Sequence, residues 1–553
     1  MIEVRVGPLV RAVGRQSAVI WVELSQPCTV ICRVAPAATN QDGRKSASVT
    51  TVTVGGRYYA VAFLEGLLSA TWYDYQLLGI GSDGEETLPA TVRQCFRTLD
   101  PVGTETTTLR VAYGSCRRSN HPEDDALSAF GNWLLGTYEA RETMWPQLLL
   151  LIGDQIYADQ PPDEVLKAHP RLQEGAATFA DFALLYEYAW SRDPNVRQVL
   201  AALPTFMIFD DHEVTNNWYT QPTWRARVLQ AGKEELLVDG LVAYWLYQGW
   251  GNLYPQQDEN HPLLQIMHRA GERGEDALPA LRTRIQADVT MAAPIRWHYT
   301  IPTQPPIFVA NARTERTAVF SDNADELYAP TQIMSAGQMS ELRSWLQGRQ
   351  QSALPIIVSS VPVLLPPVIG LGEYIMGYRL WSQQGSALHT LGVRLAQLQQ
   401  RVAEKANFDH WPLYSTSWHA LVQLLQESGQ DLLVLSGDVH FSYAMSAQLR
   451  RHATNHLYQF VSTPLQNALD EPSDRQIKLQ ARISRWNYGG LRTRVLPLQP
   501  TDQSSKVRAN LLFQNTLAMV TLQQTGTHGY SVQQEYLGII DGQMQVVGRT
   551  LLS

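Results

Sequence analysis

The sequence predicts an α/β protein in which a small β-sandwich precedes a larger layered domain. Over the first hundred residues, apolar and polar positions alternate in short runs, which is typical of antiparallel strands with one buried face. From about residue 109 the pattern changes to continuous apolar runs separated by long helical or irregular stretches, as in strands covered on both faces. The chain of 553 residues is long enough for roughly two to four domains with a sizeable core.

Alternating segments with turn signals between them predict the strands of the sandwich, at residues 18–24, 28–34, 49–54, 58–67 and 71–79. The stretch 64–75 is interpreted as a corner of the chain whose tyrosines bond back to the backbone, as in immunoglobulin-like and fibronectin type III-like folds. The polar stretch 100–108 predicts a linker. We therefore place the sandwich in residues 1–103 and the layered domain in residues 104–553.

Apolar runs predict the strands of the layered domain, at residues 109–116, 148–154, 205–212, 306–313, 354–362 and 431–440. Most of these runs end in a polar or small cluster. The region around residues 225–290 carries helical spacing, which predicts a helical insertion. From Asn510 to the end, the chain returns to strand-like alternation.

The composition disfavours several classes of protein. The chain has 44 basic and 52 acidic side chains, and the formal charge of -8 disfavours binding to nucleic acid other than as a substrate, although a local basic pocket is compatible with it. The chain contains no run of about 18 apolar residues, so we expect no membrane-spanning segment. The start, MIEVRVGPLV, lacks the pattern of a signal peptide, and we expect a cytoplasmic protein. Four cysteines are too few for a disulfide framework, and no protein partner is deducible.

Side chains that bind metals follow four of the predicted strands. They are Cys116, then Asp154 and Tyr157, then Asp210, Asp211, His212 and Asn217, and finally Asp438 and His440. Ligand sites in layered α/β folds gather outside the carboxyl ends of strands, so we expect these four ends to converge on a metal site. Thiolate, phenolate and imidazole suit a transition metal such as iron, whereas carboxylate and amide oxygens suit calcium, magnesium or manganese. Two different metals that share one acid would use all of these ligands.

Each of these segments also has a simpler interpretation. Asp154 is compatible with a helix cap, Cys116 with a buried thiol, and the segment GDVH with a turn followed by a half-buried histidine. The segment FDDHEVTNNW is compatible with an exposed loop. If its consecutive ionisable residues are buried, however, they would repel one another and be costly to desolvate without a cation. The ordered occurrence of all four segments favours the metal site.

The motifs GSC, GDQIY, LPTFMIFDDHEVTNNW and LSGDVHFSYA follow, in this order, a GPLVRAV…AVIWVEL sandwich. In this respect the chain resembles the PhoD-type alkaline phosphatases and phosphodiesterases of the calcineurin-like metallophosphoesterase superfamily, over nearly its whole length. The resemblance implies a fibronectin type III-like sandwich followed by a four-layered αββα metallophosphoesterase domain. It also implies an iron(III) ion paired with calcium.

The resemblance implies a role for each residue of these motifs. The iron ligands would be Cys116, Asp154, Tyr157 and His440, and the calcium ligands would be Asp154 as the bridge, Asp211, Asn217 and Asp438. Asn216 competes with Asn217, and Asp210 would support its neighbours. His212 would lie beside the leaving group, or else serve a structural hydrogen bond. Arg117, Arg118 and Arg313 would meet the charge of the phosphate, with an ordinary solvated pair as the alternative for the first two.

The chain also departs from the family pattern. Where relatives often read Asp-Thr-Arg, this chain reads Asn311, Ala312 and Arg313, so we expect the arginine to lack a negative partner. The aromatic segment DHWPLYSTSW, with Asp409, Trp411 and Tyr414, lines the pocket or belongs to the core. The twin-arginine export signal of secreted relatives is not seen, so either the protein is cytoplasmic or the start is not native.

Two functions from different classes follow from these observations. The first is a metal-dependent hydrolase of phosphomonoesters, phosphodiesters or both. The second is a catalytically idle relative that binds a phosphorylated ligand or a protein partner. The presence of every expected metal ligand favours the hydrolase.

Overall fold

The computed structural model describes most of the chain. The described residues are 2–37, 43–81, 84–88, 91–101, 108–119, 124–218, 228, 230–254, 258–321, 327–349, 354–379, 389–449, 455–469, 477–478, 482–525 and 529–552. Every helix within these ranges is too short or too polar to cross a bilayer.

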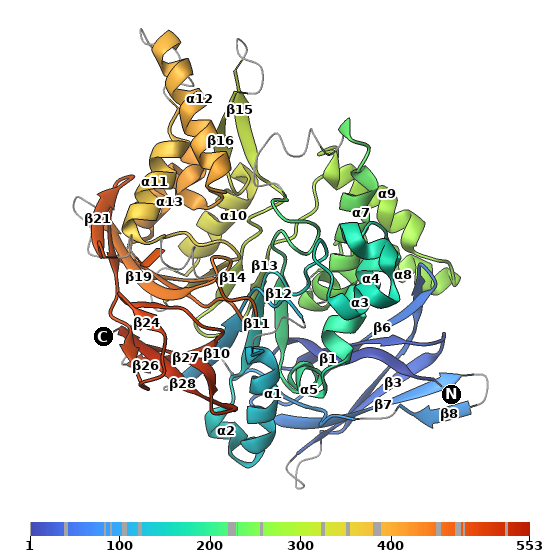
Figure 1. Cartoon of the computed structure of the whole chain (residues 1–553). Helices are drawn as coiled ribbons and strands as arrows, with labels where there is room; N and C mark the ends of the chain where they lie inside the picture. Colours follow the sequence, from blue (N-terminus) through green and yellow to red (C-terminus); the bar gives the residue numbers. More distant parts are fainter. Residues whose placement is uncertain are drawn as a thin grey trace.

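The N-terminal part is a β-sandwich of two antiparallel sheets, which confirms the prediction (Figure 1). Over the described residues, one sheet has the strand order β1-β2-β6-β5 and the other the order β4-β3-β7-β8, with β9 beside β7. The strands are β1 (Val4–Val13), β2 (Ser17–Leu24), β3 (Thr29–Pro36), β4 (Lys45–Thr50), β5 (Val52–Val54), β6 (Arg57–Glu65), β7 (Trp72–Gly81), β8 (Gly84–Thr87) and β9 (Cys95–Arg97). The expected tyrosine corner is present, because the backbone amide of Leu68 donates to the hydroxyl of Tyr73 over 2.8 Å.

Two larger sheets form the centre of the rest of the chain. In the described residues, the first has the order β12-β11-β10-β26-β27-β28-β23, and the second runs β13-β14-β17-β18-β20-β19-β22-β21 with β25 and β24 attached to β19. The first sheet contains β10 (Thr108–Gly114), β11 (Leu148–Ile152), β12 (Thr205–Ile208), β23 (Gln499–Pro500), β26 (Leu517–Thr525), β27 (Gly529–Ile540) and β28 (Gln543–Leu552). The second contains β13 (Tyr299–Ile301), β14 (Ile307–Val309), β17 (Ile356–Ser359), β18 (Leu432–Ser436), β19 (Ser442–Leu449), β20 (His456–Val461), β21 (Arg485–Tyr488), β22 (Leu491–Val495), β24 (Val507–Arg508) and β25 (Leu511–Leu512). A separate hairpin joins β15 (Thr317–Phe320) to β16 (Tyr328–Gln332).

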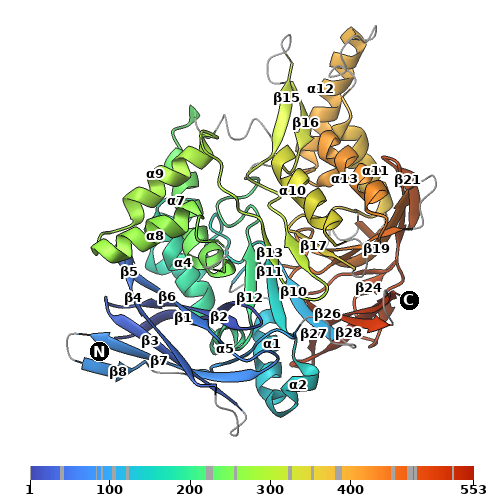
Figure 2. The same ribbon diagram turned by 180° about the vertical axis from the view of Figure 1, so that it is seen from behind.

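Helices cover the outer faces of these two sheets (Figures 1 and 2). Helix α1 contacts β26, β27 and β28, while α11 and α13 contact strands of the second sheet. The helices are α1 (Ala126–Gly136), α2 (Arg141–Met144), α3 (Asp163–Ala168), α4 (Phe179–Ser191), α5 (Pro194–Ala202), α7 (Glu234–Tyr244), α8 (Pro262–Arg273), α9 (Leu278–Val289), α10 (Ala336–Gln347), α11 (Pro367–Gly377), α12 (His389–Lys405) and α13 (Ser415–Ser428). The predicted αββα layering is confirmed.

Strand β18 shows why both faces of a central sheet are apolar. Its side chains alternate between two cores, since Leu433 and Leu435 belong to the core between the sheets and Leu432 and Val434 to the core beneath the helices. All four are buried. Strands covered on both faces therefore read as continuous apolar runs, as predicted.

The strands that precede the metal-binding motifs are parallel to their neighbours. In the first sheet β10, β11 and β12 pair in parallel, and in the second β14, β17, β18 and β20 do. Because parallel strands end at the same edge of a sheet, the loops after β10, β11 and β12 lie together, and the loop after β18 reaches them from the second sheet.

Candidate metal centre

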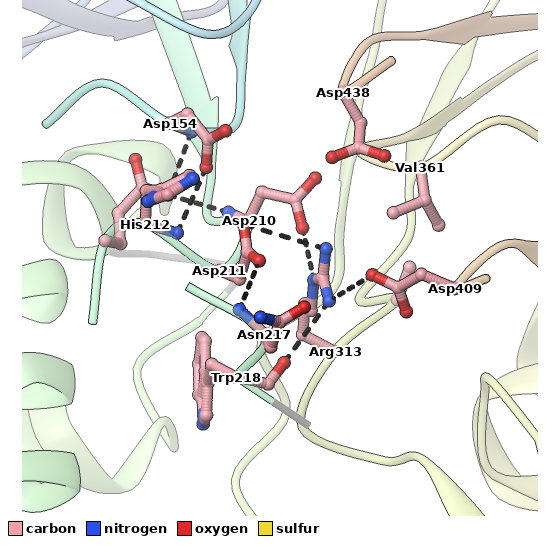
Figure 3. A network of polar contacts seen from close by, with 12 residues as sticks. Asp154, Asp210, Asp211, His212, Asn217, Trp218, Arg313, Val361, Asp409 and Asp438 are labelled. Carbon is pink, nitrogen blue, oxygen red and sulfur yellow. Dashed lines mark hydrogen bonds and ion pairs between the residues drawn. The ribbon is translucent and has the colours of Figure 1, made fainter. Parts of the chain in front are cut away.

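Polar side chains from four strand ends meet at one site. Figure 3 shows those that follow β11, β12 and β18. Three sets have ligand atoms within 4.8 Å of one another, and these sets are Cys116 with Asp154 and His440, Asp154 with Asp211 and His212, and Asp210 with Asp211 and Asp438. Two glycines allow this close approach. A Cβ on Gly153 would lie 2.6 Å from the Cβ of Asp210, and one on Gly437 would overlap the side chain of Ser115.

The backbone is strained at the predicted ligands. Cys116, Asp154, Asn217, Asp438 and His440 have φ angles of 59°, 54°, 63°, 72° and 59°. Left-handed φ angles are uncommon for residues other than glycine, and they persist where the surrounding structure and a function require them. The strained residues at these loops are therefore themselves an indication of a functional site.

The first group of ligands combines soft and hard donors around Asp154. The Asp154 Oδ2 atom lies 3.4 Å from the Sγ of Cys116 and 3.5 Å from the hydroxyl of Tyr157. The side-chain amide of Asn467 donates to that hydroxyl over 2.8 Å. His440 completes this group, so a thiol, a phenol, an imidazole and a carboxylate face one another.

The second group is made of oxygen donors from the loops after β12 and β18. It contains Asp211 and Asp438, and the backbone amide of Asn217 donates to Asp211 Oδ2 over 2.8 Å. Asn216 is exposed, and its amide instead donates to Asp159 over 3.2 Å. This placement favours Asn217 over Asn216 as the residue that faces the acids.

Burial makes the ionised forms of these groups costly. It raises the pKa of Asp154 well above its usual range, although the charge of His212 acts to lower that pKa, and the nearby acids Asp211, Asp210 and Glu213 raise it further. Burial likewise raises the pKa values of Cys116 and Tyr157. A metal cation would favour the ionised forms that coordinate it, so this set of donors fits a bound metal.

Asp438 differs from the other acids because a histidine supports it. His410 lies 3.0 Å from Asp438 Oδ2 through Nε2 and 2.6 Å from Glu373 Oε1 through Nδ1. Burial acts to raise the pKa of Asp438, but the hydrogen bond and charge of His410 outweigh it and lower that pKa. The sequence did not identify His410 or Glu373. His410 lies inside the aromatic segment that was singled out, whereas no pattern connects it to Glu373 in α11.

A second carboxyl group outside the predicted set is Glu213. It is fully buried and accepts hydrogen bonds from the backbone amides of Asp154, Gln155 and Asp210 over 2.9, 2.6 and 2.7 Å. Glu213 therefore fastens the loop after β11 to the loop after β12. Its position directly after the motif FDDH is the sequence feature that could have indicated this role.

His212 is held beside the two groups of ligands. Its Nδ1 lies 2.7 Å from Asp159, its backbone amide donates to Asp154 over 3.2 Å, and its ring stacks on Tyr157 at 4.1 Å. Burial acts to lower the pKa of His212, but the charges of Asp211 and Asp154 and the hydrogen bond with Asp159 raise it to about 10. At this pKa the imidazole is protonated at neutral pH.

The predicted arginines contact protein groups. Arg313 is fully buried, pairs with Asp210 and lies 2.7 Å from Asp409 (Figure 3). The expectation that Asn311 leaves this arginine without a negative partner is wrong, because distant segments supply Asp210, Asp409 and, at 3.8 Å, Asp211. Arg117 binds Asp125 over 2.7 Å and the carbonyl of Ala189 over 2.8 Å. These contacts differ from the phosphate contacts predicted for the two arginines.

Residues 126–495 match the PhoD-like phosphatase family, and this match spans more than half of the chain. The chain belongs to the PhoD-like phosphatase family. The resemblance inferred from the motifs is thereby confirmed, and the chain is a phosphatase-type hydrolase by family. Residues 1–98 match a domain of unknown function, DUF7800. A search of curated proteins finds no match.

Among solved structures, that of PhoD has 15% sequence identity and a TM-score of 0.57, and the match covers 99% of this chain and 88% of that chain. The purple acid phosphatase PPD1 from yellow lupin (Lupinus luteus) seeds has 12% identity and a TM-score of 0.47, over 98% of this chain and 73% of that chain. The fn3 domain of the human collagen alpha-1(XX) chain has 22% identity and a TM-score of 0.13, over 17% of this chain and 83% of that chain. The similarity to PhoD shows that this chain has the fold of that solved structure.

Proposed function

We propose that this PhoD-like phosphatase hydrolyses phosphomonoesters, phosphodiesters or both at a centre that holds iron(III) and calcium. The observation that carries the proposal is the place of Asp154 in two sets of ligand atoms, one with Cys116 and His440 and the other with Asp211 and His212. A carboxylate shared in this way suits a bridge between two ions.

In this proposal the chemistry of the ligands assigns a different set of residues to each ion. Cys116, Tyr157 and His440 supply soft and aromatic donors for iron(III), whereas Asp211, Asn217 and Asp438 supply oxygens for calcium. Asp154 serves both ions. When bound, such ions lower the pKa of a water molecule and hold a phosphoryl oxygen for attack.

The chain's own residues supply the remaining parts of the reaction. His212 is held by Asp159 and would give its proton to the leaving oxygen. Arg313 would orient the acids through Asp210, and Arg117 would anchor the Cys116 loop to the start of α1 through Asp125. In this account both arginines position other groups, and half-buried Arg118 is the remaining candidate for contact with the phosphate.

The test is turnover of p-nitrophenyl phosphate and bis-p-nitrophenyl phosphate, together with metal analysis of the purified protein. We expect turnover of at least one substrate, and the loss of both activity and iron in Asp154→Asn. Exposed Asp163, at the start of α3, offers the matched control Asp163→Asn, which should keep both.

Two outcomes would count against parts of this proposal. Bound metals without turnover of either substrate would favour the idle relative that binds a phosphorylated ligand. Full activity in a protein that contains no iron would overturn the assignment of Cys116 and Tyr157 as iron ligands.

A further inference from the structure

Strands β22 and β21 form the outer edge of the second central sheet, and β21 is labelled there in Figures 1 and 2. A basic groove lies along these two strands. The cavity has a volume of about 680 Å³. The residues that matter here are Arg485, Arg492, Arg494, Ser446, Gln448 and His456, and together they are called the arginine groove below.

The arginine groove is separate from the candidate metal centre. Strand β19 begins at Ser442, just after the loop that carries Asp438 and His440, and Gln448 lies six residues further along it. At about 3.3 Å per residue, Ser446 and Gln448 of the groove lie roughly 13 and 20 Å along the strand from Ser442. No ligand of the centre lines it.

The strand register places the basic side chains on one face. Arg485 is opposite Arg494, which is opposite Ser446, and in the next row Arg492 is opposite Gln448. Because side chains alternate along a strand, Ala447, between Ser446 and Gln448, points to the other face and is buried in the core beneath the helices. Both rows of polar side chains therefore face the cavity.

The pair formed by Arg485 and Arg494 is unfavourable by itself. Like charges directly opposite each other on neighbouring strands destabilise a sheet. Both arginines are exposed, and no carboxylate of the described residues lies within ion-pair distance of either. The nearby acid Asp431 instead lies 3.7 Å from His456. An anion from outside the chain would remove this repulsion.

The chemistry of the lining indicates the class of ligand. Guanidinium groups present several N–H donors that match phosphate oxygens, and Ser446 adds a hydroxyl, whereas the side-chain amide of Gln448 contacts His456. The volume is that of a small-molecule site, and the net charge of -8 disfavours a nucleic acid. We propose that the arginine groove binds a small anion with two or more linked phosphate groups, as a site distinct from the metal centre.

The test uses inorganic tripolyphosphate and isothermal titration, with calcium in excess so that chelation does not deplete the protein. Arg485→Gln/Arg494→Gln should weaken binding at least tenfold compared with the wild type. The matched control is Arg269→Gln, at an exposed arginine of α8 outside the groove, and it should bind as the wild type does.

A second measurement separates binding from structure. Without tripolyphosphate, the double variant should melt at or above the wild-type temperature, because a repulsive pair has been removed, and it should keep wild-type turnover. Equal affinity in the wild type and the double variant would overturn the proposal, and so would no measurable binding to either. The comparison of affinities does not depend on the activity proposed for the centre.

Discussion

At the scale of residues, three buried carboxyl groups outside the proposed ligand set hold the loops of the metal centre. Glu213 accepts hydrogen bonds from backbone amides of two loops. Glu373 holds His410 against Asp438, and Asp409 forms an ion pair with Arg313. Each of them fixes a neighbour through a hydrogen bond or ion pair in a buried setting, where such contacts are strong. The geometry of the proposed ligands thus depends on acids outside that set.

Replacement of His212 by alanine should lower turnover and leave both metals bound. A positioned proton donor contributes about 10²- to 10⁴-fold in rate, and less when the leaving group is already good. We therefore expect a larger loss with an alkyl phosphate than with p-nitrophenyl phosphate. His268→Ala, at an exposed histidine of α8, is the control. Equal losses on both substrates would show that His212 acts only through the structure of its loop.

At the scale of elements, strand runs were the readily predictable part of the chain. The apolar run 148–152 forms β11, and the motif that follows it lies in the candidate metal centre. This strand was predictable because a strand covered on both faces has a continuous apolar sequence. The contact between His410 and Glu373 left no such pattern, since α11 and the aromatic segment meet only through tertiary packing. The partners of Arg313 were missed for the same reason, as Asp210 and Asp409 are distant in sequence.

The start of α8 should make the protein sensitive to acid. The ring of His261 stacks on Trp245, with the ring centroids 5.1 Å apart. Burial, together with the charges of Arg296 and Arg284, lowers the pKa of His261 to about 4, although its hydrogen bond with the Arg296 carbonyl acts to raise that pKa. The unfolded chain takes up this proton near pH 6.5, so the contribution of neutral His261 is present above that pH and is lost as the pH falls towards 4. The loss amounts to at most roughly 3 kcal/mol.

His261→Phe keeps a ring on Trp245 and removes the titrating group. We expect denaturant unfolding to show a smaller drop in stability between pH 7 and pH 4.5 in this variant than in the wild type. His268→Phe, on the exposed side of the same helix, should retain the wild-type drop. An unchanged drop in His261→Phe would mean that other groups cause the acid sensitivity.

At the scale of the whole molecule, the sandwich and the layered part share one hydrophobic core. Val6, Leu9 and Trp21 of the sandwich belong to the same cluster as Leu149 and Met207 of the first central sheet. A shared core of this kind couples the two parts, because neither can expose its side of the interface without loss of the other's burial. We therefore expect them to unfold together.

Arg11 of β1 tests this coupling. It is fully buried, and its guanidinium donates to the carbonyls of Tyr247 and Gln248 over 3.2 and 2.5 Å and to Asn252 over 2.9 Å. Burial lowers its pKa to about 10, so it stays charged at neutral pH. Arg11→Met would fill similar space but remove the side-chain donor of the Tyr247 and Gln248 carbonyls, while Asn252 would keep its hydrogen bond from the Met207 amide; we expect a cost of roughly 3–5 kcal/mol.

The measurement is calorimetric unfolding of the wild type, of Arg11→Met and of Arg5→Met, which changes an exposed arginine of the same strand. Arg11→Met should lower the melting temperature of the whole protein in a single transition, and turnover should be lost over the same temperature range. Arg5→Met should stay within about 0.5 kcal/mol of the wild type, as surface changes usually do. A separate early transition in Arg11→Met, with turnover retained above it, would show that the layered part is stable without the sandwich and that the shared core does not couple them.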